Sequence, residues 1–189
     1  MVSQMTTSAK TYITSDLHFW HKNIMKFCPE NRGHFNGDVR LMNKTMIDDW
    51  NAIVNPGDTV YILGDVAFGS AKKGTDIVSQ LNGYKILIKG NHDVGFVKDA
   101  KFAATFDEIH DYHTIRRNGV LIVMFHYPIA EWDKAHRGSV HFYGHLHGKP
   151  SGLEQYRCRD VGYDCTGKIV QELDVAINEA LTGEIKSHH

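Results

Sequence analysis

The feature that most constrains the fold is an alternation of strand-forming and helix-forming stretches over the first 104 residues. Residues 10–15, 59–63 and 84–88 are rich in β-branched, aromatic and aliphatic side chains, which predicts three strands. A helical pattern follows each of them before the next change of pattern. Strands that alternate with helices in this way are typical of a parallel sheet in an α/β fold.

The expected helices cover residues 38–54, 70–81 and 94–104. The first is the clearest, because its apolar side chains recur on one face. Lys44 and Asp48 lie four residues apart on another face and can form an ion pair. We interpret the apolar face as part of the core.

An irregular, aromatic segment at residues 19–36 precedes the first long helix. Two interpretations of its rings stay open: they line the mouth of a substrate site, or they pack beneath a long loop. The rings are those of Phe19, Trp20, His34 and Phe35.

The pattern changes after residue 104. Strands are expected at 108–116, 120–125 and 139–143, and Arg117-Asn118-Gly119 between the first two is typical of a hairpin turn. Residues 171–181 could form either a last helix or a strand with a tail. The chain shows no repeats and no linker-like stretch, so residues 1–189 are expected to form a single domain, with residues 1–9 and 187–189 disordered or derived from a tag.

Composition excludes several classes of protein. The 189 residues are 42% hydrophobic, which favours a globular fold over disorder. The formal net charge of −1 gives no support to nucleic-acid binding. The three cysteines have no regular spacing, which suits a reducing cytosol, and no signal peptide is visible. The longest strongly apolar run, Val120 to Phe125, is too short to span a membrane, so a cytoplasmic protein without a membrane partner is expected.

Five polar segments each follow a predicted strand. In Gly144-His145-Leu146-His147-Gly148, two histidines one residue apart on an extended backbone would point to the same side. Each segment alone has an ordinary explanation as a turn, a helix cap or a surface histidine. Their occurrence together, each behind a strand, favours a site at the carboxyl ends of the strands. The segments supply Asp16 and His18, then Asp65, then Asn91, His92 and Asp93, then His126, and finally His145 and His147.

These side chains form a ligand set for metal ions. Besides His92 the segments offer carboxylates, one amide and four imidazoles, and no thiolate. Two transition-metal ions that share one carboxylate need about this many ligands. A set of nitrogen and oxygen donors suits Mn as the first expectation, with Fe, Zn, Co or Ni as alternatives.

The order of the segments resembles the signature of the calcineurin-like metallophosphoesterase family. That signature reads Asp-x-His, Gly-Asp, Gly-Asn-His-Asp/Glu, a lone His and Gly-His-x-His, and all five blocks are present between about Lys10 and Pro150. The stretches from Thr14 to Ile24 and from Phe125 to Pro128 further resemble small phosphoesterases of bacteria and phages that lack a cap domain.

The resemblance implies a role for each residue. Seven would bind metal: Asp16, His18 and His147 the first ion, Asn91, His126 and His145 the second, and Asp65 both ions as a bridge. His92 would contact the scissile phosphate without binding metal, as a general acid or a charge stabiliser. Asp93 would orient His92. A hydroxide between the two ions would attack the phosphorus in line.

The implied fold is α/β, a four-layer αββα sandwich in which two mixed sheets are flanked by helices. The implied activity is that of a phosphodiesterase acting on a small phosphate ester or a nucleotide. After Gly64-Asp65 the chain reads Val-Ala-Phe-Gly where protein phosphatases of this superfamily have Asp-Arg-Gly, which argues against a protein substrate. The alternatives are a nuclease, a non-catalytic scaffold that binds a protein, and another type of His-x-His metallohydrolase.

Overall fold

The computed structural model describes residues 8–187. The predicted disordered or tag-derived ends at 1–7 and 188–189 lie outside this range. Ser8, Ala9 and Ser187 are described and have no regular secondary structure.

The first sheet contains the three predicted strands in parallel. Its order is β4-β3-β2-β1-β9, and the first four strands run parallel while β9 is antiparallel to β1. The bounds are β1 Thr11–Thr14, β2 Thr59–Ile62, β3 Tyr84–Ile88, β4 Glu108–His110 and β9 Gln171–Glu172. The parallel sheet expected from the alternation is therefore confirmed.

The second sheet is also mixed, with the order β5-β6-β7-β8. Its strands are β5 His113–Arg117, β6 Val120–Met124, β7 Val140–Tyr143 and β8 Cys158–Asp160. β5 pairs antiparallel with β6, and the other pairs are parallel. Asn118 and Gly119 have φ angles of 51° and 80°, so the predicted hairpin turn is confirmed as a two-residue turn of the I′ type.

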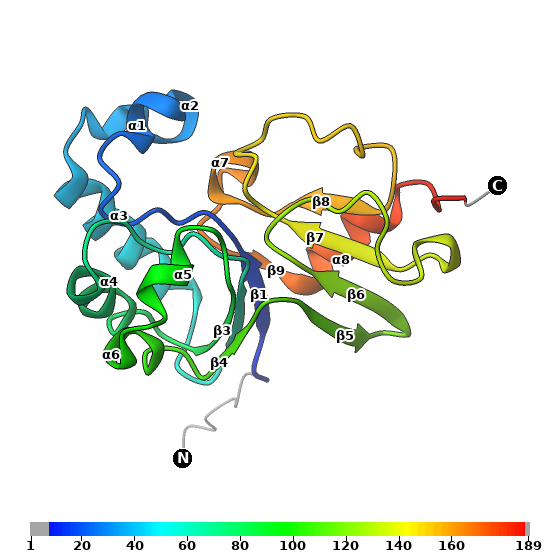
Figure 1. Cartoon of the computed structure of the whole chain (residues 1–189), viewed down its shortest axis with the longest axis horizontal. Helices are drawn as coiled ribbons and strands as arrows, with labels where there is room; N and C mark the ends of the chain where they lie inside the picture. Colours follow the sequence, from blue (N-terminus) through cyan, green and yellow to red (C-terminus); the bar gives the residue numbers. More distant parts are fainter. Residues whose placement is uncertain (1–7, 188–189) are drawn as a thin grey trace, which may run out of the picture.

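Helices flank the sheets, as Figure 1 shows, so the chain is an α/β protein with two mixed sheets. The helices are α1 Ile24–Phe27, α2 Pro29–Arg32, α3 Val39–Ile53, α4 Ala71–Val78, α5 Asp93–Phe96, α6 Ala100–Ala103, α7 Tyr163–Thr166 and α8 Leu173–Leu181, with 3-10 turns η1 Gly33–Phe35 and η2 Ala135–Arg137. Helix α3 begins where predicted, because the Asp38 carboxylate accepts from the backbone N–H groups of Arg40 and Leu41.

Two apolar cores lie on opposite faces of the first sheet. On the outer face, Trp50 of α3 and Phe102 of α6 pack with Leu87 of β3 in one cluster. This confirms that the apolar face of residues 38–54 is core. On the inner face, side chains of the first sheet such as Ile13 meet Phe142 of the second sheet.

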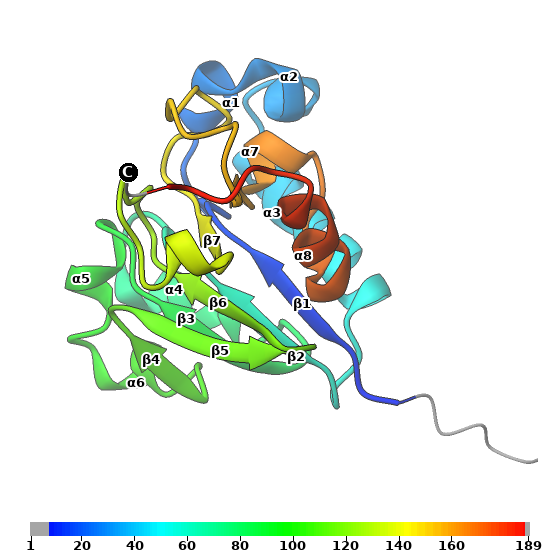
Figure 2. The same ribbon diagram turned by 90° about the vertical axis from the view of Figure 1, so that its right-hand side faces the viewer.

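Helix α8 joins the core between the sheets, where Leu173 and Ile177 are buried. Figure 2 shows it beside β1. The outer face of the second sheet is covered differently. There Val123 and Tyr143 pack against Trp132 and Ala135, so this layer consists of the η2 turn and the loops around it.

Three predictions need correction. The single strand expected at 108–116 is two strands, because the chain passes from the first sheet to the second at residues 111–112. The helix expected at 94–104 is two short helices, since the Asp99 carboxylate caps a new start at Ala100. Residues 171–181 contain both alternatives, β9 followed by α8, while β8 and α7 had not been predicted.

The carboxyl ends of the two sheets meet. Ser15, just after β1, forms a parallel bridge with Gly162, just after β8. Between the loops that follow β6 and β7, the Gly144 N–H donates to the His126 carbonyl at 2.9 Å. All five polar segments therefore reach one region of the molecule. Within residues 8–187 no helix is both long and apolar enough to cross a membrane.

Candidate metal centre

Five site residues occupy the left-handed region of backbone conformation. Their φ angles lie between 50° and 71°, and the residues are Asp16, His18, Asp65, His145 and His147. The extended backbone expected at His145 and His147 is therefore wrong. A non-glycine residue in this region is strained by roughly 1–3 kcal/mol, and such strain gathers at functional sites.

The first ligand group consists of Asp16, His18 and His147. Asp16 Oδ1 lies 3.8 Å from His18 Nε2 and 3.9 Å from His147 Nε2. Asp16 Oδ1 and His18 Nε2 are buried, and neither has a hydrogen-bond partner. Buried polar atoms are rarely left unpaired, so these two atoms favour a ligand that binds between them.

The second ligand group consists of Asp65, His126 and His145. His126 is fully buried, and its Nδ1 lies 2.6 Å from the Leu63 carbonyl, which leaves Nε2 for a ligand. That Nε2 is 3.1 Å from Asn91 Oδ1, so the structure also brings Asn91 to this group.

Asp65, a member of the second group, also faces the first group. Its Oδ2 is 3.6 Å from His18 Nε2 and 3.6 Å from His126 Nε2. Two donors that bind one ion at about 2.1 Å are roughly 3 to 3.6 Å apart, so separations near this range fit shared ions better than direct hydrogen bonds. The nitrogen and oxygen donors brought together here fit divalent transition metals.

The charge of the site also favours cations. Burial would raise the pKa of Asp16, but the neighbouring histidines hold it below its usual range. Burial would lower the pKa of His147, but hydrogen bonds with Asp164 and Cys28 and the charge of Asp16 raise it to about 10. Without a metal ion, a proton on His147 would partly compensate the carboxylates that surround it.

Glycines allow the loops to approach one another. A Cβ atom on Gly64 would lie 2.4 Å from the backbone nitrogen of Gly90, and Gly64 itself has a φ of +91°. A Cβ on Gly144 would lie 2.4 Å from Asp16 Oδ2. The loops after β2, β3 and β7 can therefore close on the site only with glycine at these positions.

His92 and Asp93 have different surroundings. His92 Nε2 lies 3.8 Å from Asp65 Oδ2, and the side chain is 39% exposed, so it faces both the centre and solvent. The Asp93 carboxylate accepts from the backbone N–H groups of Asp65, Val66 and Gly90 at 2.7, 3.1 and 2.8 Å. Asp93 was expected to orient the His92 ring. Its carboxylate instead ties the loop after β2 to the loop after β3 through these three hydrogen bonds. Burial raises its pKa to about 6.

The aromatic segment divides between core and rim. Phe19 and Phe35 are buried in the core, which confirms the packing interpretation for these two rings. The rim of the centre has other rings instead: His21 stacks on Phe68 at 4.0 Å, and Phe68 lies 4.6 Å from His92. Burial, together with His18 and His92, lowers the pKa of His21 to about 4.

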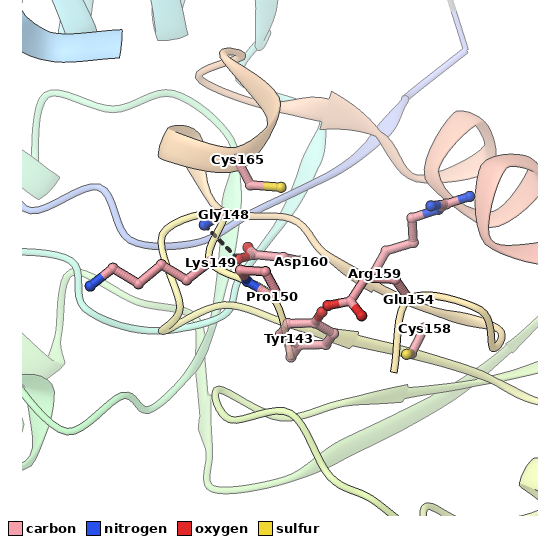
Figure 3. Close-up of a pocket in the computed structure, with 9 residues that line it drawn as sticks. All are labelled: Tyr143, Gly148, Lys149, Pro150, Glu154, Cys158, Arg159, Asp160 and Cys165. Carbon is pink, nitrogen blue, oxygen red and sulfur yellow. Dashed lines mark hydrogen bonds between the residues drawn. The ribbon is translucent and has the colours of Figure 1, made fainter. Parts of the chain in front are cut away.

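A pocket of about 400 Å³ lies next to Gly148, the residue that follows His147, and Figure 3 shows the side chains that line it. It contains none of the predicted metal ligands. Asp160 lines it and accepts from Gly148 N–H at 3.2 Å and from Gly162 N–H at 2.8 Å. Asp160 thus fixes the loop that follows His147 to the start of α7.

Comparisons with known proteins give relatives without a stated activity. No protein-family model matches the chain. An uncharacterized protein of Methanocaldococcus jannaschii, MJ1445, is 36% identical over 149 residues, which cover 78% of this chain and 73% of that protein. The chain belongs to the same family as MJ1445.

Two further proteins are similar. The Gene 66 protein of Mycobacterium phage L5 is 27% identical over 197 residues, which cover 88% of this chain and 92% of that protein. Among solved structures, a protein of unknown function from Aquifex aeolicus, AQ665, superposes with a TM-score of 0.65 at 28% identity, covering 82% of this chain and 91% of the other. The chain is therefore similar to this phage protein over most of both lengths, and it shares its overall fold with the solved Aquifex aeolicus structure.

Two residues that the sequence did not single out support the first ligand group. His147 Nδ1 lies 2.7 Å from Asp164 Oδ2, which leaves His147 Nε2 directed at Asp16. Arg32 is fully buried and donates to both Asp164 carboxylate oxygens at 2.6 and 3.0 Å, and also to the Asp16 and Leu17 carbonyls. Carboxylates that orient a metal-binding histidine in this way are common around metal sites. A sequence pattern could hardly have indicated this ion pair, because Arg32 and Asp164 are 132 residues apart.

We expect Arg32→Met to lower the free energy of unfolding by about 3–5 kcal/mol, because the buried Asp164 carboxylate loses its guanidinium partner and the Asp16 and Leu17 carbonyls lose a donor. Urea denaturation of the metal-free protein measures this. Arg117→Met is the matched control, since Arg117 binds Asp174 through the same two nitrogens at 2.6 and 2.7 Å but on the surface. Its effect should stay within about 1 kcal/mol. Similar losses in both variants would contradict a special role for the buried pair.

Proposed function

We propose that this chain is a dinuclear, metal-dependent phosphoesterase of the calcineurin-like type that hydrolyses phosphodiesters. The observation that carries the proposal is the position of Asp65 Oδ2, at equal distances of 3.6 Å from a histidine of each ligand group. A carboxylate shared in this way is what two neighbouring ions require.

The residues present fit two ions. Asp16, His18 and His147 would hold one, Asn91, His126 and His145 the other, and Asp65 would hold both. The unpaired Asp16 Oδ1 and His18 Nε2 would gain a partner. When bound, such ions supply Lewis acidity toward phosphate oxygens and lower the pKa of water.

Among the residues outside the two ligand groups, His92 is placed to move a proton. His92 reaches the centre from its exposed side and, when protonated at Nε2, can donate to the leaving oxygen of the ester. A serine nucleophile has no support here, because the Ser15 hydroxyl donates to the Leu63 carbonyl at 2.7 Å and is fully buried. These contacts support hydrolysis without a covalent enzyme intermediate.

The proposal is tested by removing and restoring metal. We expect the chelator-treated protein to lose hydrolysis of bis(p-nitrophenyl) phosphate and to regain it with Mn²⁺. Metal analysis of the restored protein should give two ions per chain. Full activity of protein that contains no metal would refute the proposal, and two bound ions without turnover of any diester would favour a non-catalytic scaffold.

A further inference from the structure

His21 lies three residues after the ligand His18, in the loop that leads from β1 to α1. Its Nδ1 is 3.2 Å from Nδ1 of His18. Its ring stacks on Phe68 with an interplanar angle of 9°, which fixes the plane of the imidazole. Two ring nitrogens at this distance share one hydrogen, so one histidine donates and the other accepts.

The other nitrogen of His18 decides the direction. His18 Nε2 is buried without a partner and faces Asp16 Oδ1 and Asp65 Oδ2 at 3.8 and 3.6 Å. A neutral imidazole carries one hydrogen, and a metal ion needs the lone pair of the nitrogen that it binds. If Nε2 binds metal, the hydrogen of His18 must be on Nδ1, and His21 Nδ1 must accept it.

If His21 were the donor instead, His18 could not bind a metal ion. If His21 donated from Nδ1, the hydrogen of His18 would move to Nε2, where both carboxylate oxygens lie beyond hydrogen-bond distance. That hydrogen would also occupy the position of the ion. An acceptor at position 21 therefore selects the form of His18 that can bind metal.

We propose that His21 is a positioning residue of the first metal site, which holds His18 with its hydrogen on Nδ1 and its Nε2 lone pair free for the ion. The inference rests on the metal centre of the proposed function and adds to it a residue outside the ligand set. His21 then carries its own hydrogen on Nε2, for which the described residues offer no hydrogen-bond partner.

Three substitutions of His21 test separately the effect of its hydrogen-bond acceptor and the effect of its aromatic ring. His21→Phe keeps a ring against Phe68 but has no acceptor. His21→Asn loses the ring but places its amide oxygen as many bonds from the backbone as Nδ1. His21→Gln moves the amide one bond further away. We expect the affinity of the first site, titrated with Zn²⁺ by calorimetry, to fall about 10- to 100-fold in the Phe and Gln variants. The Asn variant should stay close to the parent.

The second readout is the hydrogen on His18. Nitrogen-15 spectra of the Zn²⁺-loaded parent should show His18 protonated at Nδ1 and His21 at Nε2. Thermal unfolding of each variant without metal shows whether it is folded. Equal affinities in the parent and the Phe variant, or equal losses in the Phe and Asn variants, would overturn the role of His21 alone. A parent that binds no ion would overturn the metal centre as well.

Discussion

Asp65→Ala is expected to remove both metal ions and to lower phosphodiester hydrolysis by about 10³-fold or more, since bound ions supply several kcal/mol of transition-state stabilisation. The reason is geometric: Asp65 Oδ2 faces one histidine of each ligand group at 3.6 Å. No other side chain of the site faces both groups in this way among the described residues. The measurement is the number of ions per chain after dialysis, together with the rate of diester hydrolysis.

Two further variants sharpen the test. Asp65→Asn can still accept the His92 N–H through Oδ1, a contact of 3.0 Å, but its amide nitrogen cannot bridge two ions. It should lose metal as Asp65→Ala does. Asp76→Ala is the control, because Asp76 is an exposed aspartate paired only with Lys72 on α4. If Asp65→Ala retains two ions as tightly as the parent, Asp65 is not a bridge.

Asn91 offers a contrast within the ligand set. It supplies a neutral amide oxygen beside His126 and has no contact with the first group that the structure records. Asn91→Ala should therefore weaken the second site while the first site keeps its ion. Loss of both ions in this variant would mean that the two sites fill together.

The sequence predicted most of the first sheet because β1, β2 and β3 are rich in β-branched, aromatic and aliphatic residues and are followed by turns. Each polar segment could be placed at a strand end for the same reason. The change of sheet at residues 111–112 was not visible, because one run of strand-forming residues continues through it. Pairing partners, rather than local propensity, separate β4 from β5.

The side chains of the candidate metal centre were predicted as a set, but two features of their surroundings were not. The left-handed backbone of Asp16, His18 and His147 depends on hydrogen bonds between loops that are distant in sequence, such as His145 N–H to Asp16 Oδ2 at 2.9 Å. The support of His147 by Asp164 depends on the fold in the same way. A local pattern gives residue types and spacing, and long-range contacts determine how the side chains are held.

His92→Ala is expected to retain both metal ions and to lose rate. His92 belongs to neither ligand group, yet its Nε2 lies 3.8 Å from Asp65 Oδ2. If it donates a proton to the leaving oxygen, the loss should be about 10²- to 10⁴-fold for a substrate with a poor leaving group. A diester that releases a ribose hydroxyl is such a substrate, because an alkoxide needs a proton as it leaves.

The leaving group separates the two roles that His92 could have. A nitrophenolate leaves without a proton, so hydrolysis of bis(p-nitrophenyl) phosphate by His92→Ala should fall much less than hydrolysis of the ribose ester. His110→Ala is the control, since His110 lies on β4 and pairs with Glu108 at 2.8 Å. Equal losses for both substrates would mean that His92 stabilises charge on the phosphate and donates no proton. Unchanged rates for both, with two ions bound, would leave His92 without a part in the reaction.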